Sequence, residues 1–182
     1  LKASSEGLPV AFVVRGLINA TSKDEMLDFV QNIKHASGQN YILGIKGEVY
    51  DFEASTNKVV RYAPDNENGI VYHTNHPLVN DDVKPWFAQF APNVQVNKKT
   101  NSHYRYDALD NRLSDAANVN DQFLISVLIS KDNKDNPVCR ANNGRGGFTF
   151  SSVVMTLDAG NPVLKITAGP PDESEFRSFN FK

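Results

Sequence analysis

A run of hydrogen-bonding side chains follows an apolar stretch in Val71-Tyr72-His73-Thr74-Asn75-His76-Pro77-Leu78. Pro77 blocks the continuation of a strand, and His76, which precedes it, is restricted to an extended backbone. The sequence therefore predicts that Asn75 is held in a fixed position at the end of a strand. A carboxamide in this position can donate a hydrogen bond to a developing oxyanion. The alternative is that Asn75 only satisfies backbone groups of the turn.

The two histidines of this run also raise the question of a metal site. A zinc site needs at least three protein ligands. No spacing ties His73 and His76 to the other available ligands, which are His35, His103, Asp81 and Asp82. We therefore expect neither a metal nor a cofactor, and interpret the two residues as strand-end or surface histidines.

Arg105 is the second residue whose position indicates chemistry. The sequence predicts a helix that begins after Ser102, so Arg105 would lie in its first turn. A cation at the positive end of a helix is disfavoured by roughly a few tenths of a kcal/mol or more, and Asp107 would offset part of this. An arginine so placed could form a bidentate pair with a carboxylate of a substrate or of the protein. The alternative is a surface arginine whose stem lies along apolar groups.

Cys139 is the only cysteine, which excludes an internal disulfide. The adjacent Arg140 could lower the pKa of the thiol and favour a nucleophile. However, no Cys/His spacing indicates a papain-like site, so we interpret Cys139 as a free thiol at a loop–strand junction. The nearby Gly144-Arg145-Gly146-Gly147 lacks the Lys-Ser/Thr of a phosphate-binding loop.

The elements that must position these residues follow from hydrophobic spacing and turn signals. Two helices are expected first, over residues 8–19 (a strand is the alternative) and from the Ser22 cap through Lys34. Further along the chain we expect strands over 41–45, 49–53, 59–62 and 69–73, helices between 102 and 130, a loop over 131–147, and a hairpin over 149–168.

Helices and strands are grouped apart in this order, which predicts an α+β fold with helices layered on one face of a mainly antiparallel sheet. The strands of residues 41–73 and the closing hairpin should share that sheet, because a hairpin alone is unstable. At 182 residues, with 40% hydrophobic residues, the chain is expected to form a single domain over 1–182. The net charge of -2 and the absence of a long apolar run argue against nucleic acid and membrane as partners.

In combination, these residues resemble the acyl-CoA:6-aminopenicillanate acyltransferase-like proteins, which are relatives of the choloylglycine hydrolases and penicillin V acylases. Residues 69–78 resemble the HTNH segment of that family, and Ser102-His103-Tyr104-Arg105 resembles its Ser-x-x-Arg helix start. Residues 8–41 and the closing stretches 150–155 and 168–171 agree in the same order. The resemblance therefore spans nearly the whole chain.

The resemblance implies a four-layer αββα N-terminal-nucleophile hydrolase fold that cleaves or transfers the acyl group of a small N-acyl amide. It also implies that Asn75 is the oxyanion-hole side chain and that Arg105 is an active-site arginine. The family's nucleophile is a cysteine that autoproteolysis exposes at a chain start, and Leu1 is no nucleophile.

We therefore expect the chain to be the C-terminal portion of such an enzyme and to be inactive by itself. The missing N-terminal part, or self-association, would then cover a sheet face that this portion leaves exposed. The alternative is a non-catalytic binding or structural module that keeps the fold without the nucleophile.

Overall fold

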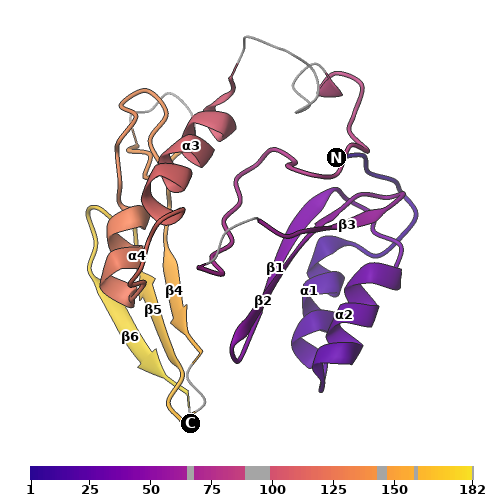
Figure 1. Ribbon diagram of the computed structural model, residues 1–182, viewed down its shortest axis with the longest axis horizontal. Coiled ribbons are helices and arrows are strands. Elements are labelled where there is room, and N and C mark those ends of the chain that lie inside the picture. The colour runs from indigo at the N-terminus through magenta and orange to yellow at the C-terminus, as the bar shows by residue number, and fades with distance from the viewer. Residues whose placement is uncertain (65–67, 89–98, 143–146, 158–159, 182) are drawn as a thin grey trace. The chain divides into compact units, whose positions relative to one another are not determined.

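The computed structural model describes residues 1–64, 68–88, 99–142, 147–157 and 160–181. Contacts divide the chain into two compact units, which are residues 1–65 with 75–99 (unit 1) and residues 66–74 with 100–182 (unit 2). In each unit, helices accompany an antiparallel sheet, so the predicted α+β class is confirmed (Figure 1). The expectation of a single domain stays a prediction. Across the described ranges, no helix has both the length and the hydrophobicity needed to cross a membrane.

Unit 1 opens with two helices, α1 (Val10–Asn19) and α2 (Lys23–Asn32), as the sequence predicts. Ser22 caps α2, because its Oγ accepts the Glu25 N–H at 3.2 Å. The two helices approach closely at Gly16, where an added Cβ would lie 2.3 Å from the Phe29 ring. A glycine is therefore required in α1 for this packing.

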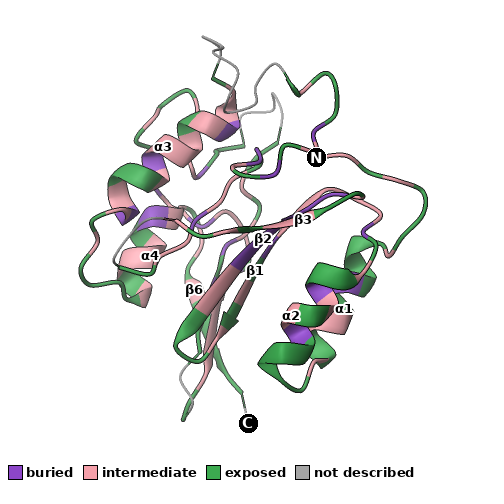
Figure 2. Ribbon diagram, turned by 45° about the vertical axis from the view of Figure 1, so that its right-hand side comes forward, coloured by how far each residue is buried: buried purple, intermediate pink, exposed green. Residues whose placement is uncertain are grey.

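Three strands follow in unit 1, and they pair in chain order as an antiparallel sheet: β1 (Gln39–Ile45), β2 (Glu48–Ala54) and β3 (Val59–Tyr62). Tyr41 of β1 pairs with Phe52 of β2, and both rings face the helices. The buried core that results joins helices to sheet and consists of Val13, Val30, Tyr41, Phe52 and Ala54 (Figure 2).

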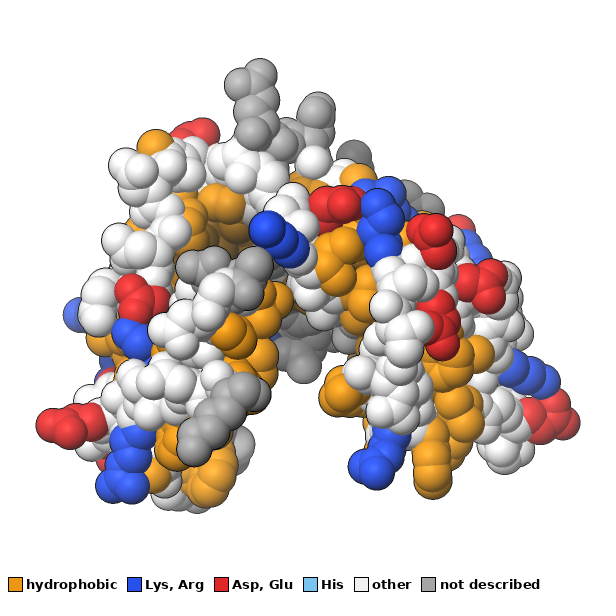
Figure 3. Space-filling model, turned by 90° about the horizontal axis from the view of Figure 1, so that it is seen from below, with side chains coloured by type: hydrophobic (Ala, Val, Ile, Leu, Met, Phe, Trp, Pro, Cys, Tyr) orange, Lys and Arg blue, Asp and Glu red, His pale blue; other side chains and the backbone are white. Residues whose placement is uncertain are grey.

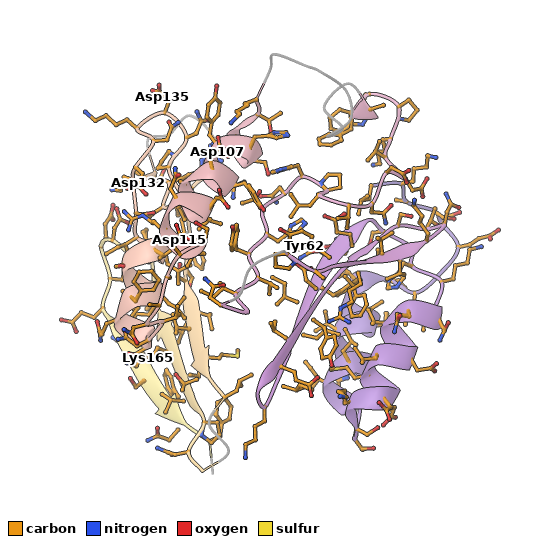
Figure 4. The ribbon with its side chains drawn as sticks, viewed as in Figure 1. Tyr62, Asp107, Asp115, Asp132, Asp135 and Lys165 are labelled. Atoms are coloured by element: carbon orange, nitrogen blue, oxygen red, sulfur yellow. The ribbon has the colours of Figure 1, made fainter. Side chains whose placement is uncertain are left out.

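Unit 2 contains α3 (Asn101–Leu113) and α4 (Asp121–Leu128), followed by a second antiparallel sheet. Its strands pair in the order β4 (Val153–Thr156), β5 (Val163–Thr167) and β6 (Phe176–Asn180). Lys165 of β5 (Figure 4) bonds to the carboxylate of Asp121 on α4, which ties this helix to the sheet. The predicted hairpin is confirmed as β4 and β5, although residues 158–159 of its turn lie outside the described residues.

The expectation that this hairpin joins the strands of residues 41–73 was wrong. The hairpin instead pairs with β6, so the third strand that a hairpin needs for stability comes from the neighbouring C-terminal segment. The strands expected from the sequence end with the hairpin and do not include Phe176–Asn180. The four-layer αββα arrangement stays a prediction.

One face of the second sheet keeps apolar side chains in contact with water. Along β4, Val154 is buried, whereas Val153 and Met155 are 44% and 58% exposed. Met155 pairs with Leu164, which is half-buried, and Leu164 pairs with the exposed Phe179 on β6, so an apolar row crosses all three strands. Hydrophobic side chains also reach the surface that Figure 3 shows. What covers the apolar face of this sheet stays a prediction.

Candidate active site

The residues that lead to Asn75 run alongside α3 in unit 2. Asn68 donates from Nδ2 to the carbonyl oxygen of Leu113 at 3.0 Å, at the end of the helix. Further along the segment, the Tyr72 hydroxyl donates to the carboxylate of Asp110, one turn earlier in the helix. Residues later in the segment contact residues earlier in α3, so residues 68–74 run antiparallel to the helix.

The same segment ends at Thr74, which is fastened to the first turn of α3. Its hydroxyl donates to the carbonyl oxygen of Ser102 at 3.0 Å. The Ser102 hydroxyl donates in return to Thr74 Oγ1 at 3.0 Å. The residue immediately before Asn75 is therefore held at the N-terminal end of the helix that carries Arg105.

This packing explains why the expected strand over residues 69–73 is absent. The apolar side chains of the segment are buried against helices instead of forming a sheet ladder. Tyr72 belongs to a core with Leu113 and Val127, and Ile70 packs against it. Alternating apolar residues fit a helix surface as well as a sheet, which is why the sequence pattern did not distinguish the two.

The N-terminus of α3 lies two residues earlier than the sequence predicts. Thr100 is the N-cap, and its backbone N–H donates to Nδ1 of His103 at 3.2 Å. Ser102 is inside the helix, where it is buried and bonded to Thr74. Arg105 is consequently the fifth residue of α3, in its second turn, so the helix dipole disfavours its charge less than expected.

Arg105 is half-buried, and its Nε donates to Oδ1 of Asn101 at 2.9 Å. Burial lowers the pKa of its guanidinium, and the positive charge of Arg140 lowers it further. An anion near Arg105 would offset the repulsion between these two cations. The planar guanidinium is suited to bind a carboxylate or another oxyanion in a bidentate manner.

Asn75 itself is exposed, whereas His76 and Pro77 after it are buried. The Asn75 side chain is thus accessible, whereas the two residues that follow it are buried. Asn75 is part of unit 1 and Arg105 is part of unit 2, so a shared site of the two stays a prediction.

Cys139 is fully buried, and its thiol donates to Oδ1 of Asp172 at 3.2 Å. Burial, followed by the negative Asp172, raises the pKa of the thiol to about 11. The other carboxylate oxygen of Asp172 forms an ion pair with Lys131 at 2.5 Å. The idea that Arg140 lowers the thiol pKa was therefore wrong, and Cys139 is a buried free thiol.

Among the hollows in the described part of unit 2, two differ in the charges of their walls. One has a volume of about 270 Å³ and is lined by the cations Lys131, Lys134 and Arg140 together with Asp135. The other, about 390 Å³, lies along α3 and contains the carboxylates of Asp107 and Asp132 among its walls. Figure 4 labels these three acidic residues on α3 and on the loop after α4. The first hollow suits a negatively charged group better than the second.

Two of the histidines form hydrogen bonds within their own unit. His35 is buried in unit 1 with Nε2 at 2.9 Å from the Val30 carbonyl oxygen, and His103 caps α3. Within the described part of the chain, no three His, Cys, Asp or Glu side chains gather where they could hold a metal ion. The Gly144-Arg145-Gly146 stretch lies outside the described residues.

Sequence reasoning predicts roles for Asn75 and Arg105, which stay predictions, and it missed the contacts that hold the backbone next to Asn75. Thr74 and Ser102 are 28 residues apart, and no local pattern marks them as partners. Glu53 gave a weak signal, because it lies between the apolar Phe52 and Ala54 of β2, and a carboxylate is rarely buried without partners.

None of the curated proteins matches the chain. The family model of the acyl-coenzyme A:6-aminopenicillanic acid acyl-transferase matches residues 1–157. That range contains unit 1, the segment along α3, and α3 and α4 with Arg105. It also contains β4, the first strand of the second sheet. The resemblance drawn from the sequence is confirmed, and the chain belongs to the acyl-coenzyme A:6-aminopenicillanic acid acyl-transferase family.

Proposed function

We propose that the protein takes part in acyl transfer from, or hydrolysis of, a small N-acyl amide, with Asn75 as the donor to the oxyanion. The observation that carries this proposal is the fixed position of Thr74. Its two hydrogen bonds with Ser102 hold the residue before Asn75 at the start of the helix that bears Arg105. Membership in an acyl-transferase family supports the reaction class.

The proposed step is nucleophilic attack on the carbonyl carbon of the amide. The electron pair of the C=O bond moves onto oxygen, and Asn75 Nδ2 donates a hydrogen bond to the resulting oxyanion. When the carbonyl re-forms, the C–N bond breaks, and the proton lost by the nucleophile passes to the leaving amine. Water then releases the acyl group in hydrolysis, or a second amine accepts it in transfer.

In this proposal Arg105 binds an anionic part of the substrate or orients the groups that react. Its half-buried guanidinium and its nearness to the charge of Arg140 favour an anionic partner. The hydrogen bond from Nε to Asn101 orients the guanidinium on α3.

We propose that the nucleophile lies outside residues 1–182. Cys139 is fully buried with a thiol pKa of about 11, which argues against it as the attacking group. Residues 1–182 would then supply the oxyanion donor and the arginine, and turnover would need the rest of the enzyme.

The test is a turnover assay of the protein made from its complete natural coding sequence, on a panel of N-acyl amides. Asn75→Ala should lower kcat by about 100-fold or more, the effect of losing one oxyanion donor. Arg105→Ala should raise KM, with partial recovery in Arg105→Lys, and the exposed α2 variant Asn32→Ala should behave as the wild type.

Equal kcat in wild type and Asn75→Ala would overturn the oxyanion role. Binding of N-acyl amides without turnover by the complete protein would instead support the non-catalytic binding module. Turnover by residues 1–182 alone that is lost in Cys139→Ala would overturn the proposed location of the nucleophile.

A further inference from the structure

We propose that Glu53 is a positioning residue for Asn75, acting through the backbone of residues 78–80. This inference rests on the proposed oxyanion role of Asn75, but it concerns a residue on a different element. All of the contacts that carry it lie within unit 1.

Glu53 is on β2, between Phe52 and Ala54, which face the helices. Because side chains alternate along a strand, the Glu53 carboxylate points to the opposite face of the sheet. It is nevertheless 0% exposed. A buried carboxylate is costly unless hydrogen-bond donors compensate for the lost water, so its partners must be strong.

Three consecutive backbone N–H groups are among the partners of this carboxylate. The N–H of Leu78 donates to Glu53 Oε1, and the N–H groups of Val79 and Asn80 donate to Oε2 at 3.0 and 2.6 Å. Hydrogen bonds to an ionised acceptor are shorter and about twice as strong as neutral ones. The carboxylate therefore fixes three successive peptide groups relative to β2.

Asn80 also holds this segment to β2, here with the segment as the hydrogen-bond donor through a side chain. Its Nδ2 donates to the carbonyl oxygen of Glu53 at 2.8 Å and to that of Lys58 at 3.3 Å. Asn80 is itself 2% exposed. The segment and β2 are thus joined by both the side chain and the backbone of Glu53.

Only two residues separate this clamp from Asn75, and neither can move freely. His76 and Pro77 are both buried, and the proline ring fixes its own φ and restricts the residue before it. A shift of residues 78–80 would therefore be transmitted to Asn75. Misplacement of a catalytic group by about 1 Å can cost a factor of about 100 in rate, so a structural clamp here has a catalytic consequence.

The test uses Glu53→Gln in the complete natural protein. The glutamine amide would place a donor against backbone N–H groups, so the clamp loosens with little change in size. We expect kcat to fall about tenfold or more with KM within about twofold, and the amides of Leu78, Val79 and Asn80 to lose protection from hydrogen exchange. Glu48→Gln, on the exposed start of the same strand, is the matched control and should change neither.

A double-mutant cycle separates positioning from a general structural effect. If Glu53 acts through Asn75, Glu53→Gln should lower kcat in the wild type but add less than about twofold in an Asn75→Ala background. An equal effect of Glu53→Gln in both backgrounds would overturn the positioning role while leaving the proposed function intact. Unchanged kcat in Asn75→Ala alone would overturn the proposed function itself.

Should Glu53→Gln fail to fold, Asn80→Ala provides the same cycle with a milder change. It removes the two side-chain donations of Asn80 and keeps the Glu53 carboxylate with its three N–H partners. We expect a loss of a few-fold in kcat that again disappears in the Asn75→Ala background. A kcat equal to that of the wild type, with residues 78–80 losing exchange protection, would overturn the inference.

Discussion

Asn75 and Cys139 both have side chains that can take part in chemistry, but they differ in their exposure. The Asn75 side chain is exposed, while the backbone on either side of it is held by Thr74 and by the buried His76 and Pro77. At Cys139 the side chain itself is buried and bonded to Asp172. The comparison shows that residue type alone does not tell whether a side chain is accessible: Asn75 is exposed, whereas Cys139 is buried.

The largest expected effect is that of Asn75→Asp, which tests the proposed role of the exposed Asn75 side chain. Asn75→Asp keeps the shape of the side chain but replaces the donor with a negative charge that would repel an oxyanion. We expect kcat to fall about 1000-fold or more, beyond the effect of Asn75→Ala, because loss of a donor and like-charge repulsion combine. Steady-state kinetics of the complete protein measure this, with Asn32→Asp on α2 as control. A weaker effect than that of Asn75→Ala would contradict an oxyanion role.

The next prediction concerns the reactivity of Cys139. With a thiol pKa of about 11 instead of about 9, the thiolate fraction near pH 8 falls about 100-fold. Alkylation of the native protein by iodoacetamide should therefore be about 100-fold slower than in denaturant, and burial should slow it further. Mass spectrometry of the Cys139 peptide over pH 7–10 gives both rates. Equal alkylation rates of Cys139 in the native and denatured protein would contradict its burial and its raised pKa.

The smallest expected effect is that of Cys139→Ala on catalysis. The kcat of the complete protein should stay within about twofold, while unfolding becomes easier by about 1–2 kcal/mol through lost packing and a lost donor to Asp172.

The stability difference between wild type and Cys139→Ala should also depend on pH. The folded thiol pKa is raised from about 9 to about 11, so the contribution of the thiol is full below pH 9 and is lost as pH rises toward 11. Denaturant unfolding at pH 8 and pH 10.5 measures this difference. A difference that grows with pH would show that the thiol ionises easily in the folded protein.

Much of unit 1 could be predicted because its signals are local. The Ser22 cap, the helical spacing of Met26 and Val30, and the turn at Gly47 between β1 and β2 each depend on a few neighbouring residues. Gly47 has a φ of 77°, a conformation that glycine adopts without strain. Short-range preferences of this kind are present in the sequence itself.

The pairing of distant segments could not be predicted in this way. Nothing in β5 indicates that β6 rather than the strands of unit 1 completes its sheet, because hydrogen-bond ladders do not depend on side-chain identity. Pro77 and the family resemblance led to the prediction for Asn75, whereas no pattern led to one for Glu53. A carboxylate in a strand is ordinarily assigned to the solvent face, and only the structure shows that three backbone N–H groups compensate for its burial.

The antiparallel contacts of residues 68–74 with α3 also bear on the order of folding. Their sequence separations increase outward, from 28 residues for Thr74 with Ser102 to 38 for Tyr72 with Asp110 and 45 for Asn68 with Leu113. A helix forms within about a microsecond from local contacts, whereas long-range contacts wait for loop closure. Residues 69–74 have no helix or sheet ladder of their own, so they depend on α3 being present. Residues 69–74 therefore take up their positions late in folding, after α3 has formed.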